Sequence, residues 1–141
     1  MSHDMEVIGD PTFSVAGVDV DAQVWREPTE VGDLQEIDIG LYPLPDEEWV
    51  LGKSGLKALQ YMALGFPTEA TDIGANRRVI RDGENGFLVD SASGWKASIR
   101  NLAANPDLRR RVGGAARRTV VEGFSVTVNQ AAYLDVLERV F

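Results

Sequence analysis

The sequence contains no cysteine, a single histidine and no long apolar run. Without cysteine, the chain can form neither a disulfide nor a thiolate metal site. No apolar segment approaches the roughly 20 residues of a membrane-spanning helix, and no secretory signal is visible. We therefore expect a cytoplasmic protein with no membrane span. The histidine, His3, lies in a start (residues 1–5) that resembles an expression remnant, so the domain is assigned to residues 6–141.

Basic residues are also few. The 141 residues include 14 lysines and arginines against 22 acidic side chains, which gives a formal net charge of -8. An acidic chain of this kind lacks the attraction on which nonspecific nucleic-acid binding depends, so we expect no nucleic-acid partner. The hydrophobic content of 44% is that of an ordinary globular protein, and the length suffices for one domain with a core.

Short apolar segments alternate with amphipathic ones along the whole chain. The pattern predicts strands at 6–10, 18–25, 38–44, 68–71 and 87–89, and helices at 28–37, 54–64, 76–81, 91–104, 108–121 and 126–141. This alternation is typical of an α/β fold, a Rossmann-like parallel sheet with helices on both faces. The apolar segment 38–44 is expected at the centre of the sheet and the alternating segment 18–25 at an edge. Thr29, and Ser91 or Ser93, are predicted to cap helices.

The predicted helix 54–64 and its neighbouring loops carry the clearest functional signal. The helix begins on Gly52-Lys53-Ser54-Gly55, so free amide donors and the positive end of the helix dipole meet a small cationic loop. Gly65 follows the last periodic position, where a left-handed helix end favours glycine, and Pro67 prevents further helix. This arrangement is a ready anion site. The alternative is a glycine needed only for a tight turn, with the lysines solvated on a helix face.

The loop after the predicted strand 68–71 supports the functional interpretation. It reads Asp72-Ile73-Gly74-Ala75-Asn76. A glycine-bearing loop at the carboxyl end of a strand is where open α/β sheets bind ligands. The anion site and this loop are therefore expected at the same edge of the sheet.

An ordered series of short motifs resembles the donor-binding half of glycosyltransferase family 4, also called group 1. The motifs are Gly65-Phe66-Pro67, Ala70-Thr71-Asp72-Ile73-Gly74, Asn76-Arg77, Val79-Ile80, Asp82-Gly83 and Asn85-Gly86-Phe87-Leu88-Val89. The resemblance covers nearly all of the chain after about Val7. It implies a retaining enzyme of the two-Rossmann (GT-B) architecture, with this chain as its C-terminal domain truncated at the N-terminal side.

The resemblance also implies that the sheet is incomplete. A full donor domain of the family has strands in the order 3-2-1-4-5-6. Residues 7–10 match its second strand, so the first strand, the basic residues that follow it and the acceptor-binding N-terminal domain have no counterpart here. The two strands beside the gap would then expose unpaired edges. We expect either direct pairing of these strands or an intertwined homodimer that fills the gap.

The family's two donor-binding carboxylates are replaced in this sequence. Aligned on Gly55, their positions hold Gly52 and Gln60. Gln60 can still hydrogen-bond a ribose hydroxyl through its amide, whereas Gly52 has no side chain for a sugar contact. The resemblance therefore supports no confident assignment of a catalytic residue.

The donor-binding residues implied by the resemblance come from two stretches. They are Lys53, Ser54, Gly55, Leu56, Lys57, Gln60, Trp25 and Arg26. Lys53 is expected to contact a phosphate or the sugar, and the amides of residues 54–56 to bind donor oxygens. Lys57 lies one turn further from the helix start. Trp25 and Arg26 fall where the family's base-contact loop begins, with packing at the sheet edge as the alternative for Trp25.

Thr68-Glu69 departs from the family pattern, which has two β-branched apolar residues in this strand. A buried glutamate is costly unless it is paired. We therefore expect Glu69 either to reach solvent or to have a partner.

The implied activity is transfer of a sugar from a nucleoside-diphosphate-sugar to an acceptor, in glycan or polysaccharide biosynthesis. Basic side chains and helix amides would stabilise the leaving diphosphate, so neither a metal nor another cofactor is expected. Alone, the chain is expected to be inactive, because half of the cleft is missing. The main alternative is a non-catalytic binding or assembly module. A flavodoxin-like phosphate-binding domain fits less well, because the 9–12 turn is short and acidic.

Overall fold

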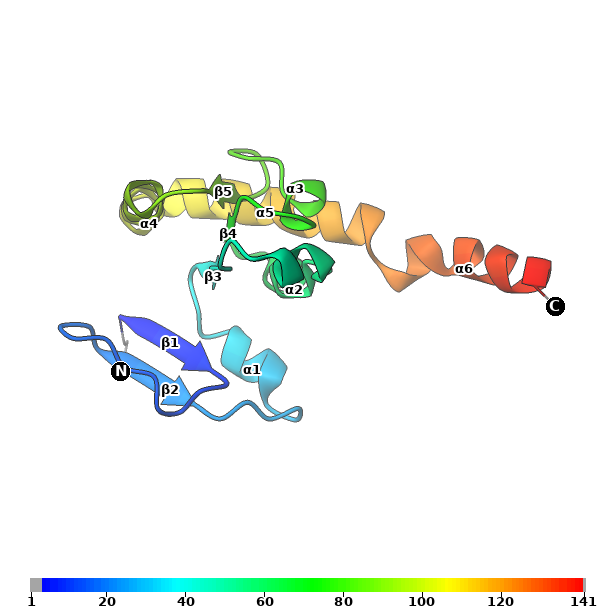
Figure 1. Ribbon diagram of the computed structural model, residues 1–141. Helices are drawn as coiled ribbons and strands as arrows, with labels where there is room; N and C mark the ends of the chain where they lie inside the picture. The colour runs from blue at the N-terminus through cyan, green and yellow to red at the C-terminus, as the bar shows by residue number, and fades with distance from the viewer. Residues whose placement is uncertain (1–3, 141) are drawn as a thin grey trace. The chain divides into compact units, whose positions relative to one another are not determined.

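The computed structural model describes residues 4–140, and the chain divides into two compact units, residues 1–37 and 38–141. Figure 1 labels the strands and helices of both units. His3 and the last residue of the predicted C-terminal helix, Phe141, lie outside the described residues. Met5, the last residue of the remnant-like start, begins the first strand.

The first unit is built on two parallel strands. β1 (Met5–Ile8) pairs with β2 (Val20–Gln23), with Met5 opposite Val20 and Ile8 opposite Gln23. Both strands are half-buried and shorter than predicted, and the backbone leaves β2 before Val24 and Trp25, which are exposed. The ladder between the two strands is four residues long, and a sheet of only two strands has little further packing to stabilise a longer one.

A short helix, α1 (Glu30–Leu34), follows in the first unit. Thr29 occupies the position before it, as predicted, but its hydroxyl is not a cap. The hydroxyl donates to the Asp33 carboxylate at 2.8 Å instead of accepting a bond from a backbone amide of the first turn. The prediction of a threonine cap at this position was therefore wrong.

The second unit holds a parallel sheet in the order β3-β4-β5. β3 is Gly40–Tyr42, β4 is Thr68–Thr71 and β5 is Phe87–Val89. β4 is the central strand, and β3, predicted to be central, is an edge strand. The strands of residues 4–140 form two separate sheets, so direct pairing across the gap is not found and the homodimer stays a prediction.

The helices described in the second unit are η1 (Glu48–Gly52, a 3-10 helix), α2 (Leu56–Ala63), α3 (Asn76–Val79), α4 (Ala92–Ala104), α5 (Pro106–Gly123) and α6 (Val126–Val140). Of these, α2 and α5 pack on one face of the sheet and α4 lies on the other. Ala70 of β4 packs into a buried cluster with Ala58 and Met62 of α2 and Ala116 of α5. Its neighbour Glu69 points to the other face, because successive strand residues alternate, and α4 lies there.

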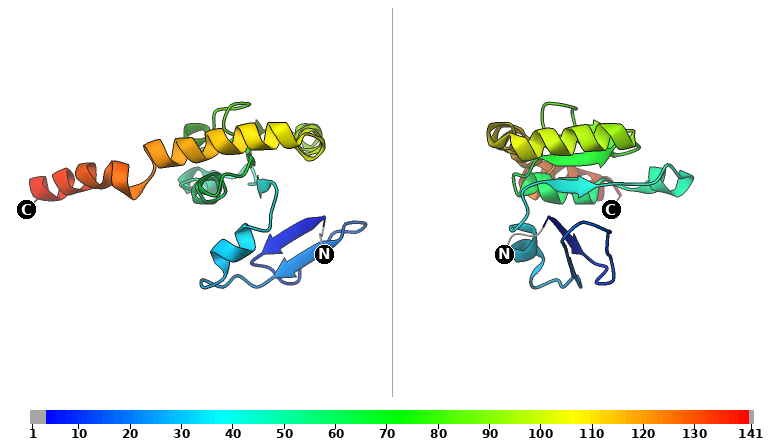
Figure 2. Two further views of the ribbon diagram at one scale, coloured as in Figure 1. Left: turned by 180° about the vertical axis from the view of Figure 1, so that it is seen from behind. Right: turned by 90° about the vertical axis from the view of Figure 1, so that its left-hand side faces the viewer.

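The turn from α2 into β4 is fixed by two glycines that meet. Gly65 has φ +83°, and the amides of Gly65 and Phe66 donate to the carbonyls of Met62 and Tyr61, as in a Schellman motif. Gly113 of α5 lies against this turn: a Cβ there would be 2.0 Å from the Gly65 carbonyl oxygen. α5 and α2 therefore run side by side in close contact (Figure 2).

Side-chain caps set the start of α4 and α5. The Ser91 hydroxyl accepts from the Gly94 amide at 3.2 Å, so Ser91 is the cap of α4. The Asn105 side chain accepts from the Leu108 amide, with proline at the first helical position. α5 therefore starts at Pro106, two residues before the predicted start, because proline is well suited to this position.

The last helix, α6, leads away from the sheet beyond the end of α5 (Figure 1). No residue of 126–140 is buried, and Val126, Tyr133 and Val140 are each more than two-thirds exposed. None of the helices in the described part of the chain is long and apolar enough to cross a membrane.

Candidate functional site

The candidate site begins at the start of α2. Gly55 has φ +76°, a left-handed conformation that a helical residue cannot have, so α2 starts at Leu56 and not at Ser54 as predicted. The Leu59 amide donates to the Gly55 carbonyl at 3.1 Å, which closes the first helical turn. Gly55 stands at the N-cap position of α2 and offers no side chain to cap it. An uncapped helix start of this kind attracts anions.

This helix start lies at the carboxyl ends of the strands, as predicted. A Cβ on Gly55 would be 3.5 to 3.7 Å from Asn76, Val79 and Ala75, which follow β4. Gly74, with φ +52°, lies in the same loop and packs against the backbone of Val50 and Leu51. The loop before α2 and the loop after β4 are therefore packed together.

Polar groups close the strand ends beneath this loop. The Asn76 side-chain amide donates to the Thr71 carbonyl at 2.9 Å. The Thr71 hydroxyl accepts from the Leu44 amide at 2.7 Å and donates to the Leu44 carbonyl. These bonds join the ends of β3 and β4 and so fix the strand ends next to the start of α2.

Lys53 is the exposed cation of the site. Its ammonium lies 5.0 Å from the centre of the Trp49 ring, a distance typical of a cation–π contact. The Trp49 indole N–H donates to the Glu47 carboxylate. The sequence did not predict this array of Glu47, Trp49 and Lys53. Lys53 follows η1 in an extended conformation, so no helical spacing links it to Trp49 and the sequence carried no local signal of the contact.

The other predicted residues of α2 lie along the helix. Ser54 and Lys57 are exposed, and Leu56 has 60% of its side chain exposed, so its amide and not its side chain is the feature of interest. Gln60 is half-buried one turn further on. Lys53 and Ser54 thus directly precede the start of α2 in the chain.

Trp25 and Arg26 belong to the first unit. Both are exposed and follow the carboxyl end of β2. The Arg26 carbonyl accepts from the amides of Thr29 and Glu30 and so fixes the turn into α1. Their contact with a nucleotide base stays a prediction.

Arg77 is a second cation at the carboxyl end of β4. Its Nε donates to the Asp72 carboxylate at 2.6 Å, and its terminal nitrogen donates to the Asp72 carbonyl at 2.8 Å. Hydrogen bonding to Asp72 and the charge of that carboxylate raise the pKa of Arg77. Because Asp72 already holds the guanidinium, Lys53 is the better candidate for contact with a phosphate.

Glu69 lies inside the sheet layer, and neither expected arrangement is found. Its exposed fraction is 0%, and both carboxyl oxygens lack a hydrogen-bond partner among residues 4–140. Burial raises the pKa of Glu69 above its usual value, and the nearby Ser98 hydroxyl of α4 offsets only part of this rise.

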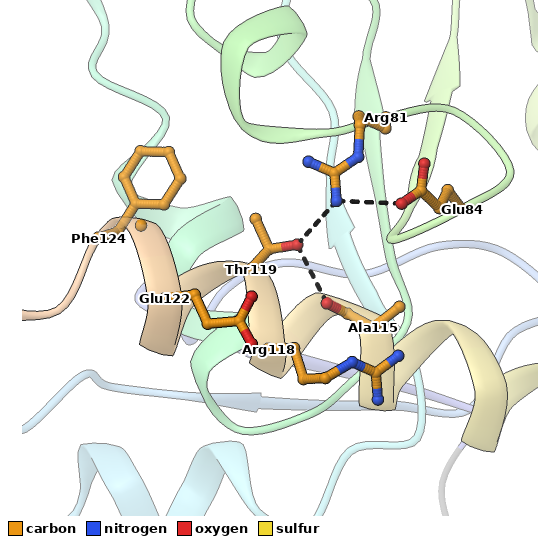
Figure 3. Close-up of a pocket in the computed structure, with 8 residues that line it drawn as sticks. Arg81, Glu84, Ala115, Arg118, Thr119, Glu122 and Phe124 are labelled. Atoms are coloured by element: carbon orange, nitrogen blue, oxygen red, sulfur yellow. Dashed lines mark hydrogen bonds and ion pairs between the residues drawn. The ribbon is translucent and has the colours of Figure 1, made fainter.

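A separate groove of about 440 Å³ lies between the turn after α3 and the C-terminal half of α5 (Figure 3). The Arg81 guanidinium bonds Glu84 at 3.1 Å and Thr119 at 3.4 Å there, so its charge is already balanced. None of the predicted donor-binding residues lines this groove. Within residues 4–140, no three histidine or acidic side chains are grouped to hold a metal ion.

Comparison with known proteins identifies the family. Residues 18–105, more than half of the chain, match the family described as "Glycosyl transferases group 1". The chain belongs to the group 1 glycosyltransferases. This confirms the resemblance on which the donor-site assignment was based.

Two curated relatives of this glycosyltransferase chain illustrate the match. A D-inositol 3-phosphate glycosyltransferase of Thermobispora bispora is 38% identical over 91 residues, which are 61% of this chain and 21% of that protein. A putative glycosyltransferase, EpsD, of Bacillus subtilis is 41% identical over 70 residues, 48% of this chain and 18% of its own. The chain therefore spans about a fifth of the length of these relatives.

Solved structures confirm the GT-B fold. The C-terminal domain of a glycosyl transferase group 1 protein (LpcC) from Francisella tularensis aligns with a TM-score of 0.63 at 23% identity, over 78% of this chain and 56% of its own. HepE from Anabaena, solved with UDP and glucose, aligns with a TM-score of 0.68 at 18% identity, over 85% of this chain and 32% of its own. The chain thus shares the fold of a C-terminal glycosyltransferase domain.

Proposed function

We propose that this chain is the donor-binding part of a retaining glycosyltransferase. The complete enzyme would move a sugar from a nucleoside-diphosphate-sugar to an acceptor, in the cytoplasm, during glycan or polysaccharide biosynthesis. One observation carries the proposal. The uncapped start of α2, with Lys53 before it, lies at the carboxyl end of β4 against a glycine-bearing loop.

The chemistry of this arrangement suits a diphosphate. Amides at a helix start and a nearby ammonium together stabilise negative charge without a metal ion. During transfer, charge develops on the leaving diphosphate, and donors fixed by the fold would stabilise it. HepE, which shares the fold, was solved with UDP and glucose, which supports a nucleotide ligand of this class for the present chain.

The isolated chain would bind a donor weakly and would not catalyse transfer. Gly52 and Gln60 stand where the family's carboxylates are expected. The acceptor-binding domain and the first strand of the donor domain would come from elsewhere. Strands of a second copy of the chain would instead pair with the open edges of the sheets, because β1 and β3 each have one edge with no strand paired to it among residues 4–140.

The second candidate function is a non-catalytic binding or assembly module that kept the fold. The absence of both family carboxylates favours it. Measurable binding of a nucleoside diphosphate would support the donor-site proposal over this one. A module that only assembles with other proteins would not bind the nucleotide.

The test is a titration of the whole chain with UDP, GDP and their sugar conjugates, observed by ligand-detected NMR. Binding in the millimolar range is expected, with Lys53→Ala weakening it about three- to tenfold, as for one charge-assisted contact. Lys96→Ala, an exposed lysine on α4, is the matched control and should leave binding unchanged. Binding of no nucleotide at millimolar concentration would refute the donor-site proposal.

A further inference from the structure

Trp49 is an exposed tryptophan in an unusual setting. Its side chain is 56% exposed, and it lies in η1 directly after three acidic residues, Asp46, Glu47 and Glu48. An exposed indole gains little from burial, so packing alone does not explain it. Two polar contacts explain the position of the indole: its N–H donates to Glu47, and its ring faces the Lys53 ammonium.

The geometry points to Trp49 as a positioning residue of the donor site, acting through Lys53. This inference rests on the proposed function, because it assigns Lys53 to a donor phosphate. The indole ring would hold the ammonium where the phosphate binds, and Glu47 would fix the plane of the ring.

The kind of contact matters as much as its place. Within the described part of the chain no ion pair of Lys53 is found, although three acidic residues, 46–48, lie shortly before it in the sequence. A carboxylate partner would neutralise the ammonium and use its N–H donors. A ring face attracts the cation through its quadrupole and leaves all three donors for a phosphate.

The segment that carries the ring is itself fixed. Val50 is 1% exposed, its amide donates to the Glu47 carbonyl at 3.0 Å, and the Lys53 amide donates to the Val50 carbonyl at 2.9 Å. The Leu51 Cα would lie 3.6 Å from a Cβ on Gly74. The stack is therefore anchored to the loop that follows β4, and not on a free surface loop.

Two measurements on the whole chain test the inference. The first detects the stack without any ligand. In the NMR spectrum, ring current should move the Lys53 CεH2 protons upfield. The shift should vanish in Trp49→Ala and largely persist in Trp49→Phe.

The second measurement is the affinity for UDP. Trp49→Ala should weaken binding about two- to fivefold, the size of an exposed cation–π contact. Trp49→Phe should restore most of the affinity. Because Trp49 acts through Lys53, the double variant Trp49→Ala, Lys53→Ala should bind UDP no more weakly than Lys53→Ala alone.

The outcomes separate the two proposals. If the wild-type chain binds no UDP, GDP or sugar conjugate, the proposed function fails and the positioning role fails with it. If it binds UDP but the Lys53 protons show no ring-current shift, only the positioning role is overturned. Additive losses in the double variant would also overturn it, since Trp49 would then act independently of Lys53.

Discussion

The buried carboxyl of Glu69 offers the sharpest test of the structure. It sits at the centre of β4 with an exposed fraction of 0% and no hydrogen bond to either oxygen among the described residues. Glu69→Val replaces it with a β-branched residue that suits a strand. We expect the valine variant to be more stable than the wild type, because a costly polar group is removed from the interior.

The size of the effect follows from the cost of burial. An unsatisfied buried polar group costs about 1–3 kcal/mol, and the smaller valine leaves a gap that takes back part of the gain. A net gain of about 1 kcal/mol is expected at pH 4, where the carboxyl is largely neutral, and this gain raises Tm by at least about 3 °C for a unit of this size. Glu69→Gln keeps the shape and the unsatisfied polar atoms, so its gain should be smaller.

The effect should also depend on pH in one direction. Burial raises the pKa of Glu69 in the folded protein above its ordinary value of 4.5. Below that value the carboxyl is neutral in both states and costs no ionisation energy. As the pH rises from there through the folded pKa, the wild type loses stability by about 1.4 kcal/mol per pH unit, and the loss then stops.

Thermal unfolding followed by circular dichroism between pH 4 and pH 8 measures both effects. The advantage of Glu69→Val over the wild type should be smallest at pH 4 and should grow toward neutral pH. Glu69→Gln should show the same pH-dependent part of the gain. A lower Tm for the valine variant, or a gain that is the same at both ends of the range, would contradict the burial of this carboxyl.

Three further predictions concern packing. In chemical denaturation, Gly113→Ala should destabilise the protein by about 1–3 kcal/mol, because the new Cβ would collide with the Gly65 carbonyl. Gly114→Ala is the control and should be neutral or stabilising, because its Cβ would lie 3.7 Å from the nearest atom, in the Arg118 side chain. Asn85→Ala should lower the free energy of unfolding by about 2–3 kcal/mol, since this buried side chain bonds the Arg81 amide, the Val79 carbonyl and the Thr119 hydroxyl. An equal loss in Asn101→Ala, which changes an exposed asparagine, would refute this. Removal of residues 125–141 should change the stability of the second unit by less than about 1 kcal/mol, because α6 buries no residue, and a large fall in Tm would show otherwise.

Local sequence signals predicted much of the second unit. The stop of α2 at Gly65, the short strand 68–71, the strand 87–89 and the serine cap of α4 depend on neighbouring residues, and the structure has them. The position of the α2 start at the carboxyl end of β4 also followed from the α/β pattern. Such features are readable from sequence because one or two residues fix the backbone conformation.

Other features depend on contacts between distant parts of the chain. The buried Glu69, the edge position of β3 and the Trp49 array beside Lys53 could not be derived from local pattern alone. In the sequence alone, Gly113 only lowers the helix propensity of its segment. The fold shows that a glycine is needed there, because the Gly65 carbonyl lies where a Cβ would be.

The sequence by itself thus determined the family, the order of strands and helices, and the loop at which an anion is expected. These features depend on short motifs and on the spacing of apolar residues along each segment. Only the tertiary structure decided which strand is central, which polar groups are buried and what holds Lys53. Those properties depend on which side chains meet across the fold, and residues far apart in the chain carry no local trace of such a contact.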